Sequence, residues 1–467
     1  MLYTFVRGAF ITLSCATLGA TRDLVVAIYG GGAASATFAH AIKDYSHIDL
    51  QYFDPALNLT PTSFRLYGFA PSVHFALDQI SEEAGGAINR AGWYAEDPSL
   101  VVVDQGPDAG TVILDWAKQP NTTHHPEVTV VDPAAYLMQM LNPVGKRRLH
   151  PNKTLISVTQ QKITSTSDFP LGLYFQDGTN IQADVLVGDD GAFGNMRGHV
   201  LGPSHPATAP VFMNFLSAVA HVPVDQAKKY LGPKFGDKKA GRRFEHIGQG
   251  SWFLSAYLDG FFTTLGSFYT GESYDLSQFT RSTTVEELKA RFGGLADGEG
   301  VVKVLSTFSG LRLIPEIEHP HAPTYVNGRI AMIGNAAHTM TNFQQLGPSQ
   351  DVEDAMILGA VLGQASAGDD YSIDAALYAF DEVRRPRSQW VAEHGKRLGM
   401  LWTGMVEGVG IDVAKLRAQF LQWKDDSEAF DAKRHKEAAL ELMKKKLHDD
   451  KGNHAIAYED KQEVLEL

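Results

Sequence analysis

The sequence predicts an α/β fold that has a parallel sheet, an inserted sheet-based region and helices near the C-terminus. Residues 24–28, 183–188 and 328–333 are mainly apolar runs of the kind that form buried parallel strands. Within 202–323, apolar and polar residues alternate, which is typical of strands in a second sheet. Residues 424–446 are rich in charge and have apolar residues at helical spacing, so a partly amphipathic helix is expected there.

Composition excludes several classes of function. The chain has 467 residues, and 41 Lys and Arg against 54 Asp and Glu give a formal net charge of −13. The acidic balance argues against nucleic-acid binding. Cys15 is the one cysteine, so a disulfide framework and a cysteine-rich metal site are excluded. The histidine pairs His124-His125 and His319/His321 have no acidic partners at ligand spacing, and no metal is expected.

Residues 1–21 form an N-terminal extension or a signal-like segment. Arg7 precedes the apolar stretch 10–18, in which Ser14 and Ala16 could serve a signal peptidase. The stretch is shorter and richer in hydroxyl groups than a membrane span, and whether it is cleaved stays open. A cytoplasmic location is expected because the chain cannot form disulfides. The alternative is a form associated with the ER, with membrane contact only if this segment is an anchor.

A β–α–β unit follows the extension. The strand at 24–28 runs into Gly30, Gly31 and Gly32, then into a helical stretch at 36–45 and a second strand at 48–53. Glycines at this turn let the backbone approach a pyrophosphate at the helix N-terminus. Asp54, at the end of the second strand, can accept hydrogen bonds from ribose hydroxyls. The pattern therefore predicts a Rossmann-like dinucleotide site, with Ser35 in place of the usual third glycine.

Two further motifs follow in the sequence. Strand-like runs at 155–159 and 171–175 come first, and Asp177-Gly178 is a hairpin signal. The run at 183–188 then ends in Asp190-Gly191, and the run at 328–333 enters a loop at Gly334. Pro348 occupies the first turn of an expected helix. The apolar residues of that helix keep one helical face: Val352, Ala355, Met356, Gly359 and Leu362.

These motifs, in this order, resemble the FAD-dependent aromatic-ring monooxygenases, the group of p-hydroxybenzoate and salicylate hydroxylases, and particularly its fungal members. The resemblance covers about residues 24–402 and includes 65–77 and 379–389. It implies a Rossmann-like FAD-binding domain with an inserted sheet-based substrate domain and C-terminal helices. The expected division is an extension at 1–21, a discontinuous FAD-binding domain at 22–200 and 321–400 with part of the substrate sheet between 60 and 130, a substrate domain at 201–320, and C-terminal helices and tail at 401–467.

The resemblance also implies which residues contact FAD. It places a helix N-terminus at 347–349 near the pyrimidine edge of the flavin, where the helix dipole would stabilise the reduced, anionic ring. It links the Asp-Gly motif at 190–191 to both FAD and the nicotinamide cofactor. The implied set comprises Gly30, Gly32, Ser35, Asp54, Gly68, Asp190, Gly191, Arg197, Gly334, Asn335, Gly347, Pro348 and Ser349.

The implied activity is that of an NAD(P)H-dependent oxidoreductase. NADH or NADPH reduces the flavin, O2 adds to it, and the flavin hydroperoxide hydroxylates or oxidatively dearomatises an aromatic small molecule, as in fungal secondary metabolism. Besides Ser35, three positions depart from the family pattern. Pro133 and Val219 stand where relatives have arginines, and Asn335 replaces an aspartate. Two alternatives therefore stay open: oxidation of a neutral, non-aromatic metabolite, for example by epoxidation, or a flavin-binding protein without monooxygenase turnover.

Four aromatic residues are candidates for the walls of the substrate pocket: Phe212, Phe215, Tyr257 and Phe261. Tyr257 is the only one with a hydroxyl, and it is the candidate for a catalytic hydrogen bond to the substrate. For each of the four, ordinary core packing is the alternative interpretation.

Overall fold

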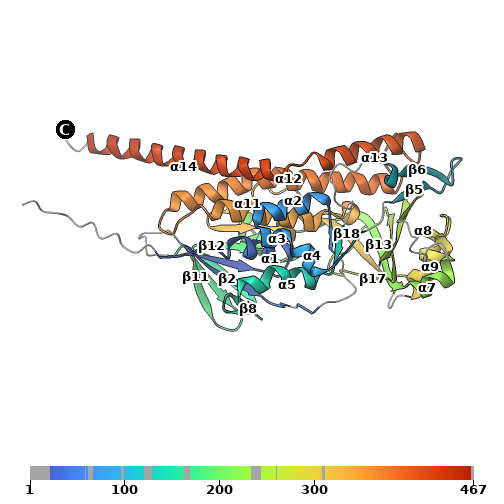
Figure 1. The fold of residues 1–467 in the computed structure, drawn as a ribbon, viewed down its shortest axis with the longest axis horizontal. Coiled ribbons are helices and arrows are strands. Elements are labelled where there is room, and N and C mark those ends of the chain that lie inside the picture. Colours follow the sequence, from blue (N-terminus) through green and yellow to red (C-terminus); the bar gives the residue numbers. More distant parts are fainter. Residues whose placement is uncertain are drawn as a thin grey trace, which may run out of the picture.

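The computed structural model describes residues 22–57, 59–60, 67–95, 99–119, 129–161, 169–232, 243–258, 260–307 and 311–463. The expected N-terminal extension and His124-His125 lie outside these residues. Two large sheets dominate the fold, and long helices pack along them (Figure 1).

The first sheet is the predicted parallel sheet, and β1 lies near its centre. Its six strands have the order β19-β20-β12-β1-β2-β8. All neighbours pair in parallel except β19, which pairs antiparallel with β20. The bounds are β1 Leu24–Tyr29, β2 Ile48–Asp54, β8 Leu149–Pro151, β12 Val185–Gly188, β19 Val326–Asn327 and β20 Ile330–Met332. The strands expected from the three apolar runs are confirmed.

Helices cover one side of this sheet, and a smaller sheet adds to the same core. Helix α1 connects β1 to β2 and packs against α5 and α11. The sheet β9–β11 contributes Leu171, Leu173 and Phe175, and its hairpin turns at Asp177-Gly178 as predicted. Burial on both faces explains why the strands are apolar throughout. The bounds are α1 Ala33–Ile42, α5 Pro133–Leu141, α11 Gly347–Leu362, β9 Leu155–Gln160, β10 Leu171–Phe175 and β11 Asn180–Ala183.

The second sheet has eight strands in the order β17-β18-β13-β16-β15-β14-β5-β6. Helices α7, α8 and α9 pack on one face, around Phe253, Phe268 and Phe292. The opposite face carries Phe215 and Trp252 towards the C-terminal helices. The bounds are β5 Leu100–Val103, β6 Thr111–Asp115, β13 Val211–Pro223, β14 Phe244–Ile247, β15 Ser251–Leu258, β16 Phe261–Tyr269, β17 Arg281–Ser282, β18 Arg312–Glu318, α7 Val224–Leu231, α8 Val285–Phe292 and α9 Gly298–Thr307.

Shorter elements complete the fold. The small sheet β3-β7-β4 precedes α5, and α2 follows β3 directly and packs on α11. Helix α6 follows β12, and α10 follows β20. The bounds are β3 Tyr67–Phe69, β4 Trp93–Ala95, β7 Thr129–Val131, α2 Pro71–Ile80, α3 Glu82–Gly85, α4 Ala87–Ala91, α6 Met196–Leu201 and α10 Gly334–His338.

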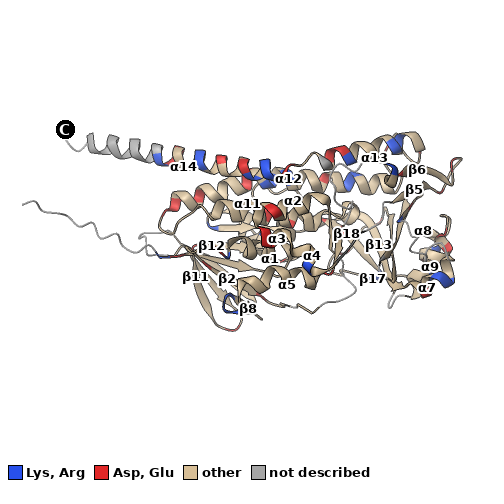
Figure 2. Cartoon of the chain, viewed as in Figure 1, with Lys and Arg blue, Asp and Glu red and all other residues tan. Residues whose placement is uncertain are grey.

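Three helices close the fold: α12 (Asp370–Trp402), α13 (Val413–Glu428) and α14 (Ala432–Glu463). The prediction of one helix over 424–446 is wrong. Asp431 accepts a hydrogen bond from the Arg434 backbone N–H at 3.0 Å and so caps the start of a separate helix. Charged residues of both signs occur along α13 and α14 (Figure 2). In the part of the chain that is described, every helix is too short or too polar to cross a membrane.

Candidate active site

The glycine turn after β1 is closely packed. Gly30 has φ +115°, and a Cβ atom built on it would overlap the carbonyl oxygen of Asp189. A Cβ atom on Gly31 would overlap the Asp54 carboxylate, and one on Gly32 would overlap that of Asp189. Gly32, the N-cap of α1, has no side chain to cap this helix, and within the first turn the Ser35 backbone N–H donates to Asp189 Oδ2. The turn therefore requires glycine, and the N–H groups at the start of α1 suit an anion such as a pyrophosphate.

Ser35 is fully buried and holds this turn together. Its Oγ accepts a hydrogen bond from the Gly32 backbone N–H at 3.0 Å and lies 3.2 Å from the Tyr52 hydroxyl. Its own backbone N–H donates to Asp189 Oδ2 at 3.1 Å. Serine therefore fits at this position because its hydroxyl is satisfied within the interface between helix and strand.

Asp54 ends β2 beside the glycine turn, as expected. Its Oδ1 accepts a hydrogen bond from the Ala56 backbone N–H at 2.8 Å. Burial raises the pKa of its carboxyl. The carboxylate lies against Gly31, so it is placed to accept hydrogen bonds from a ribose bound along the turn.

Asp189 was not identified from the sequence, although its neighbour Asp190 was. The Asp189 carboxylate packs against both Gly32 and Gly334, so it joins the two turns that follow β1 and β20. Burial, together with the nearby charge of Asp190, raises its pKa to about 7. Asp190 has a different role, because its Oδ2 accepts hydrogen bonds from Asn195 N at 2.6 Å and Met196 N at 3.0 Å and so caps α6. The turn is completed by Gly191, whose φ is +83°.

Arg197 is a buried residue that holds the loop after β20 by hydrogen bonds. It is 1% exposed, and its Nε donates to Ala207 O at 2.7 Å. Its Nη1 donates to the carbonyls of Ala336 and Ala337 at 3.1 and 2.7 Å, and Nη2 donates to Pro320 O at 3.0 Å. Burial lowers its pKa to about 10. The arginine therefore uses its guanidinium on backbone carbonyls and fixes the shape of this loop.

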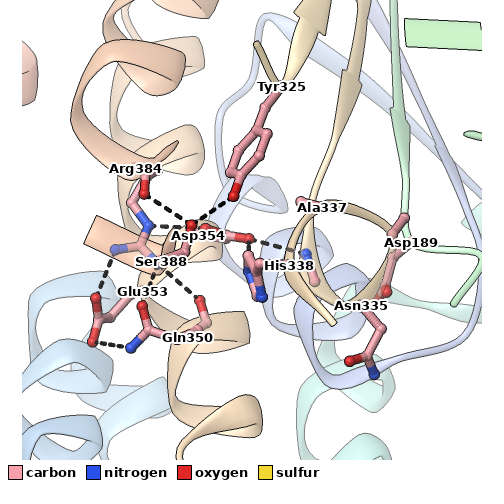
Figure 3. Close-up of polar contacts among 12 residues, drawn as sticks. Asp189, Tyr325, Asn335, Ala337, His338, Gln350, Glu353, Asp354, Arg384 and Ser388 are labelled. Atoms are coloured by element: carbon pink, nitrogen blue, oxygen red, sulfur yellow. Dashed lines mark hydrogen bonds and ion pairs between the residues drawn. The ribbon is translucent and has the colours of Figure 1, made fainter. Parts of the chain in front are cut away.

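A cluster of buried charged residues, Glu353, Asp354 and Arg384, also holds the loop after β20 (Figure 3). The Gly334 backbone N–H donates to Asp354 Oδ2 at 2.9 Å, and His338 Nε2 lies 2.8 Å from the same oxygen. Arg384 reaches Asp354 Oδ1 through Nε at 2.8 Å and Glu353 through Nη1 at 2.6 Å. Asn335 is exposed at the open side of the loop, where a ligand could contact it.

The start of α11 meets the segment that contains Gly68. Gly347 and Pro348 begin α11, and Ser349 Oγ accepts a hydrogen bond from the Ala70 backbone N–H at 3.2 Å. Gly68 lies in β3 opposite Val130 of β7. The structure thus brings together two segments that are far apart in the sequence and that the resemblance placed beside the flavin.

Pro133 is explained by its position in a helix. It is the first residue of α5, where a proline is favoured because no backbone N–H is needed. Asp132 caps the same helix by accepting a hydrogen bond from the Ala135 N–H at 2.9 Å. Val219 lies on β13, on the same face as Phe215, and is partly buried.

A cavity of about 170 Å³ opens beside the start of α11. It extends from Ala70 and Leu346 to the edge of the eight-stranded sheet. Gln344 fixes one wall, because its Oε1 accepts a hydrogen bond from Trp423 Nε1 at 3.3 Å and its Nε2 donates to Val391 O at 2.5 Å. Basic residues line it as well, among them Arg387 and Lys424. Its aromatic lining residues are Phe75, Trp116, Phe343, Trp402, Trp423 and Phe430.

Glu245 is a polar residue of this wall that the sequence did not reveal. Its side chain is 2% exposed. Trp252 Nε1 donates to its Oε2 at 3.3 Å, and Arg243 Nη2 lies 3.0 Å from its Oε1. The sequence carries no signal for this role, because Glu245 is a glutamate within an ordinary strand. The pairing of β14 with β15 shows that it faces the cavity.

Of the four predicted pocket residues, Phe215 alone packs against a residue of the cavity wall, Phe343, with ring centroids 5.0 Å apart. Tyr257 alternates with Trp252 along β15 and so lies on the face opposite the cavity. Phe212 packs against the core under α7–α9 and lines a separate cavity of about 210 Å³, and Phe261 stacks on His221. The strand geometry therefore speaks against the catalytic role expected for Tyr257.

Comparisons with known proteins show the family to which the chain belongs. No protein-family model matches the chain. It is 64% identical over 441 residues to the FAD-dependent monooxygenase elcH of Phaeosphaeria nodorum, covering 94% of this chain and 90% of that protein. It is 27% identical over 375 residues to the 6-methylsalicylate 1-monooxygenase atA of Aspergillus terreus, covering 78% and 80%.

Solved structures share the fold. A salicylate hydroxylase substrate complex has a TM-score of 0.75 at 21% identity, covering 89% of this chain and 98% of that one. HpxO of Klebsiella pneumoniae, complexed with FAD and uric acid, has a TM-score of 0.65 at 18% identity, covering 90% and 96%. The glycine turn, the acid after β2 and the loop after β20 thus lie in a chain that aligns over 94% of its length with an FAD-dependent monooxygenase. The chain belongs to the FAD-dependent monooxygenases.

Proposed function

We propose that this monooxygenase binds an aromatic small molecule in the cavity beside α11 and uses NADH or NADPH and O2 to hydroxylate or oxidatively dearomatise it. The observation that carries the proposal is the position of the cavity. It begins at Ala70 and Leu346, next to the start of α11, and ends against an aromatic wall. Aromatic walls around a few polar groups are typical of sites for small ring compounds.

The proposal assigns FAD to the cradle formed by the two turns after β1 and β20. Gly30, Gly32 and the start of α1 would hold the pyrophosphate, and Asp54 the adenosine ribose. The N-terminus of α11 would face the pyrimidine edge, where its dipole favours negative charge on the ring. When bound, FAD supplies the redox chemistry. The full proposed set is Gly30, Gly32, Ser35, Asp54, Gly68, Asp190, Gly191, Arg197, Gly334, Asn335, Gly347, Pro348 and Ser349, of which Ser35, Asp190 and Arg197 act by holding the cradle in shape.

An aromatic substrate is supported by two further points. The names of relatives refer to 6-methylsalicylate and salicylate. The cavity wall itself contains three tryptophans, Trp116, Trp402 and Trp423, on which a ring can pack. The protein would position the ring and keep water away from the reacting atoms.

The proposed domain division follows the two sheets. Strands at 24–54, 149–151, 185–188 and 326–332 build the parallel sheet, while strands at 100–115 and 211–318 build the other. This distribution supports a discontinuous FAD-binding domain with an inserted substrate domain. We also propose a cytosolic location, supported by the need for NAD(P)H; fractionation of cells that express the full-length chain tests it.

Oxygen transfer is the test of the proposed function. The full-length protein, loaded with FAD, is incubated with NADPH or NADH, isotopically labelled O2 and a panel of phenols that includes 6-methylsalicylate and 3-methylphenol. We expect at least one phenol to stimulate NAD(P)H oxidation and to yield a product that contains one labelled oxygen atom. NAD(P)H oxidation that no ring compound stimulates, with no label in any product, would contradict the proposal.

A matched pair of variants ties the activity to the cavity. Ser427 lines the cavity, and its Oγ donates to the Trp423 carbonyl one turn earlier in α13. Ser306 makes the same kind of bond to Val302 in α9, far from the cavity lining. Ser427→Phe should fill the cavity and abolish substrate-stimulated turnover, while Ser306→Phe should retain it. Equal turnover in both variants would place the substrate elsewhere.

A further inference from the structure

We propose that Glu245 selects a substrate ring that carries a hydroxyl group, by accepting a hydrogen bond from that hydroxyl. This inference rests on the proposed function, because it concerns the same cavity. The observations behind it are the burial of the Glu245 side chain, its position in the cavity wall and the two donors that hold it.

Glu245 faces the cavity because of strand pairing. It lies on β14 directly opposite Leu254 of β15, and Trp252 and Leu254 share one face of β15. That face packs against α12, where Trp252 stacks on Trp402 with ring centroids 5.6 Å apart. The carboxylate therefore projects from the sheet towards the helices, into a wall that also carries six aromatic side chains.

A carboxylate at this position needs a compensating role. Burying an ionised carboxylate among apolar groups is costly unless charge and hydrogen bonds compensate for it. Arg243 supplies the charge, and the Trp252 indole N–H supplies a hydrogen bond. If this position served packing alone, an apolar side chain of similar size would be sufficient. A few polar groups that converge on an apolar cavity are the usual means by which a site orients its ligand.

The chemistry of this group defines the class of ligand. An ionised carboxylate only accepts hydrogen bonds, and its two oxygens can accept several. A phenolic O–H can therefore bind to it, a methyl ether of the same ring cannot, and a ring carboxylate would bring a second negative charge beside the first. Arg243 lies beside Glu245, and Arg387 and Lys424 also line the cavity. For neutral rings, the cavity should thus prefer phenols to the matching ethers.

The experiment measures three ring compounds of similar shape by isothermal titration calorimetry: 3-methylphenol, 3-methylanisole and 3-methylbenzoate. The full-length protein is loaded with FAD. We expect wild type to bind the phenol about ten- to a hundredfold more tightly than the ether, the range expected for a hydrogen bond to a charged group. The benzoate tests whether the basic residues Arg243, Arg387 and Lys424 make the cavity an anion site instead.

Variants then assign the preference to Glu245. In Glu245→Gln the advantage of the phenol over the ether should fall by about tenfold, while affinity for the ether stays the same. The double variant Glu245→Gln with Arg243→Gln removes both charges together, so it avoids an unpaired buried arginine and should lose the same advantage. Glu286→Gln, on the exposed first turn of α8, is the control and should keep the wild-type preference.

Each outcome separates this inference from the proposed function. If wild type binds phenol and ether equally, or if both Glu245 variants keep the preference for phenol, the role of Glu245 is wrong while the cavity remains the binding site. If the benzoate binds most tightly and Arg243→Gln abolishes that binding, the pair is an anion site and the inference is overturned. If none of the three compounds binds to wild type, the proposed substrate cavity itself is wrong.

Discussion

The backbone N–H of Gly334 donates a hydrogen bond to Oδ2 of Asp354, with N and O 2.9 Å apart, so helix α11 fixes the turn that follows β20. Asp354 is fully buried and also pairs with His338 and Arg384. Burial alone would raise the pKa of this carboxyl, but the charges of His338 and Arg384 lower it below its usual value. The loop proposed to contact FAD is thus connected to α12 through buried charges (Figure 3).

Replacing Asp354 by Asn should strongly destabilise the protein. The substitution leaves the buried Arg384 with one carboxylate partner fewer, and breaking a buried ion pair from one side costs about 3–5 kcal/mol. Urea unfolding of Asp354→Asn measures this loss. The control is Asp225→Asn, which removes a largely exposed carboxylate and should change the free energy of unfolding by less than about 0.5 kcal/mol. Similar stability of the two variants would show that the buried cluster does not hold the loop.

Gly30→Ala should prevent FAD from binding. Its φ of +115° is unfavourable for alanine, and the added methyl group would overlap the Asp189 carbonyl, so the turn must open. Gly178→Ala is the matched control, because Gly178 also has positive φ, +83°, but has open space around the position of a Cβ atom. The control should lose about 1 kcal/mol of stability and keep its FAD. The ratio of FAD to protein in each purified variant, from visible absorbance, decides the matter; full FAD content in Gly30→Ala would contradict the assignment of the cradle.

Asp189 should make the protein less stable as pH rises from acid to neutral. Burial and the charge of Asp190 raise its pKa from 3.8 to about 7, so the folded state binds this proton more tightly than the unfolded state does. Its unfavourable contribution therefore grows between about pH 4 and pH 7 and is complete above that range. Asp189→Asn removes the titration. The stability of this variant relative to wild type should increase by about 1–3 kcal/mol from about pH 5 to about pH 8 in denaturant unfolding; a difference that does not change with pH would rule out a raised pKa.

His319 should have the opposite effect on the pH dependence of stability, making the protein less stable as pH falls. Burial, and then the charge of Arg197, lower its pKa from 6.5 to about 3, so the unfolded state binds the proton more tightly. The stability that depends on a neutral imidazole is present above about pH 6.5 and is lost as pH falls towards 3. His319→Phe should reduce the loss of thermal stability between about pH 7 and pH 5, while His448→Phe, on the exposed side of α14, should leave it unchanged. Equal acid sensitivity of wild type and both variants would exclude a buried neutral His319.

The parts of the fold that depend on local patterns could be predicted from the sequence. The glycine turn between β1 and α1, the hairpin at Asp177-Gly178 and the start of α11 at Pro348 each carry a local signal that burial reinforces. The helix at 424–446 was predicted as one element because its apolar spacing continues across the break. The signal for the break was Asp431, which caps the second helix.

The parts that depend on pairing between distant strands could not be predicted. Asp189 and Asp190 are adjacent in the sequence, yet only Asp189 packs against the turns at Gly32 and Gly334. Which of the two does so depends on how the chain leaves the end of β12. Likewise, the alternation along β14 and β15 turns Glu245 towards the cavity and Tyr257 away from it. A sequence gives the period of a strand, but the face that becomes the cavity is set by the helices that pack on it.

The central claim, that an aromatic ring binds in the cavity next to the flavin, is tested most directly by a visible difference spectrum. The full-length protein loaded with FAD is titrated with 3-methylphenol, in wild type and in Ser427→Phe with equal FAD content. A change in the flavin bands that saturates in wild type and is absent in the filled variant is the predicted result. Identical spectral changes in both proteins, or no change in wild type, would contradict the claim.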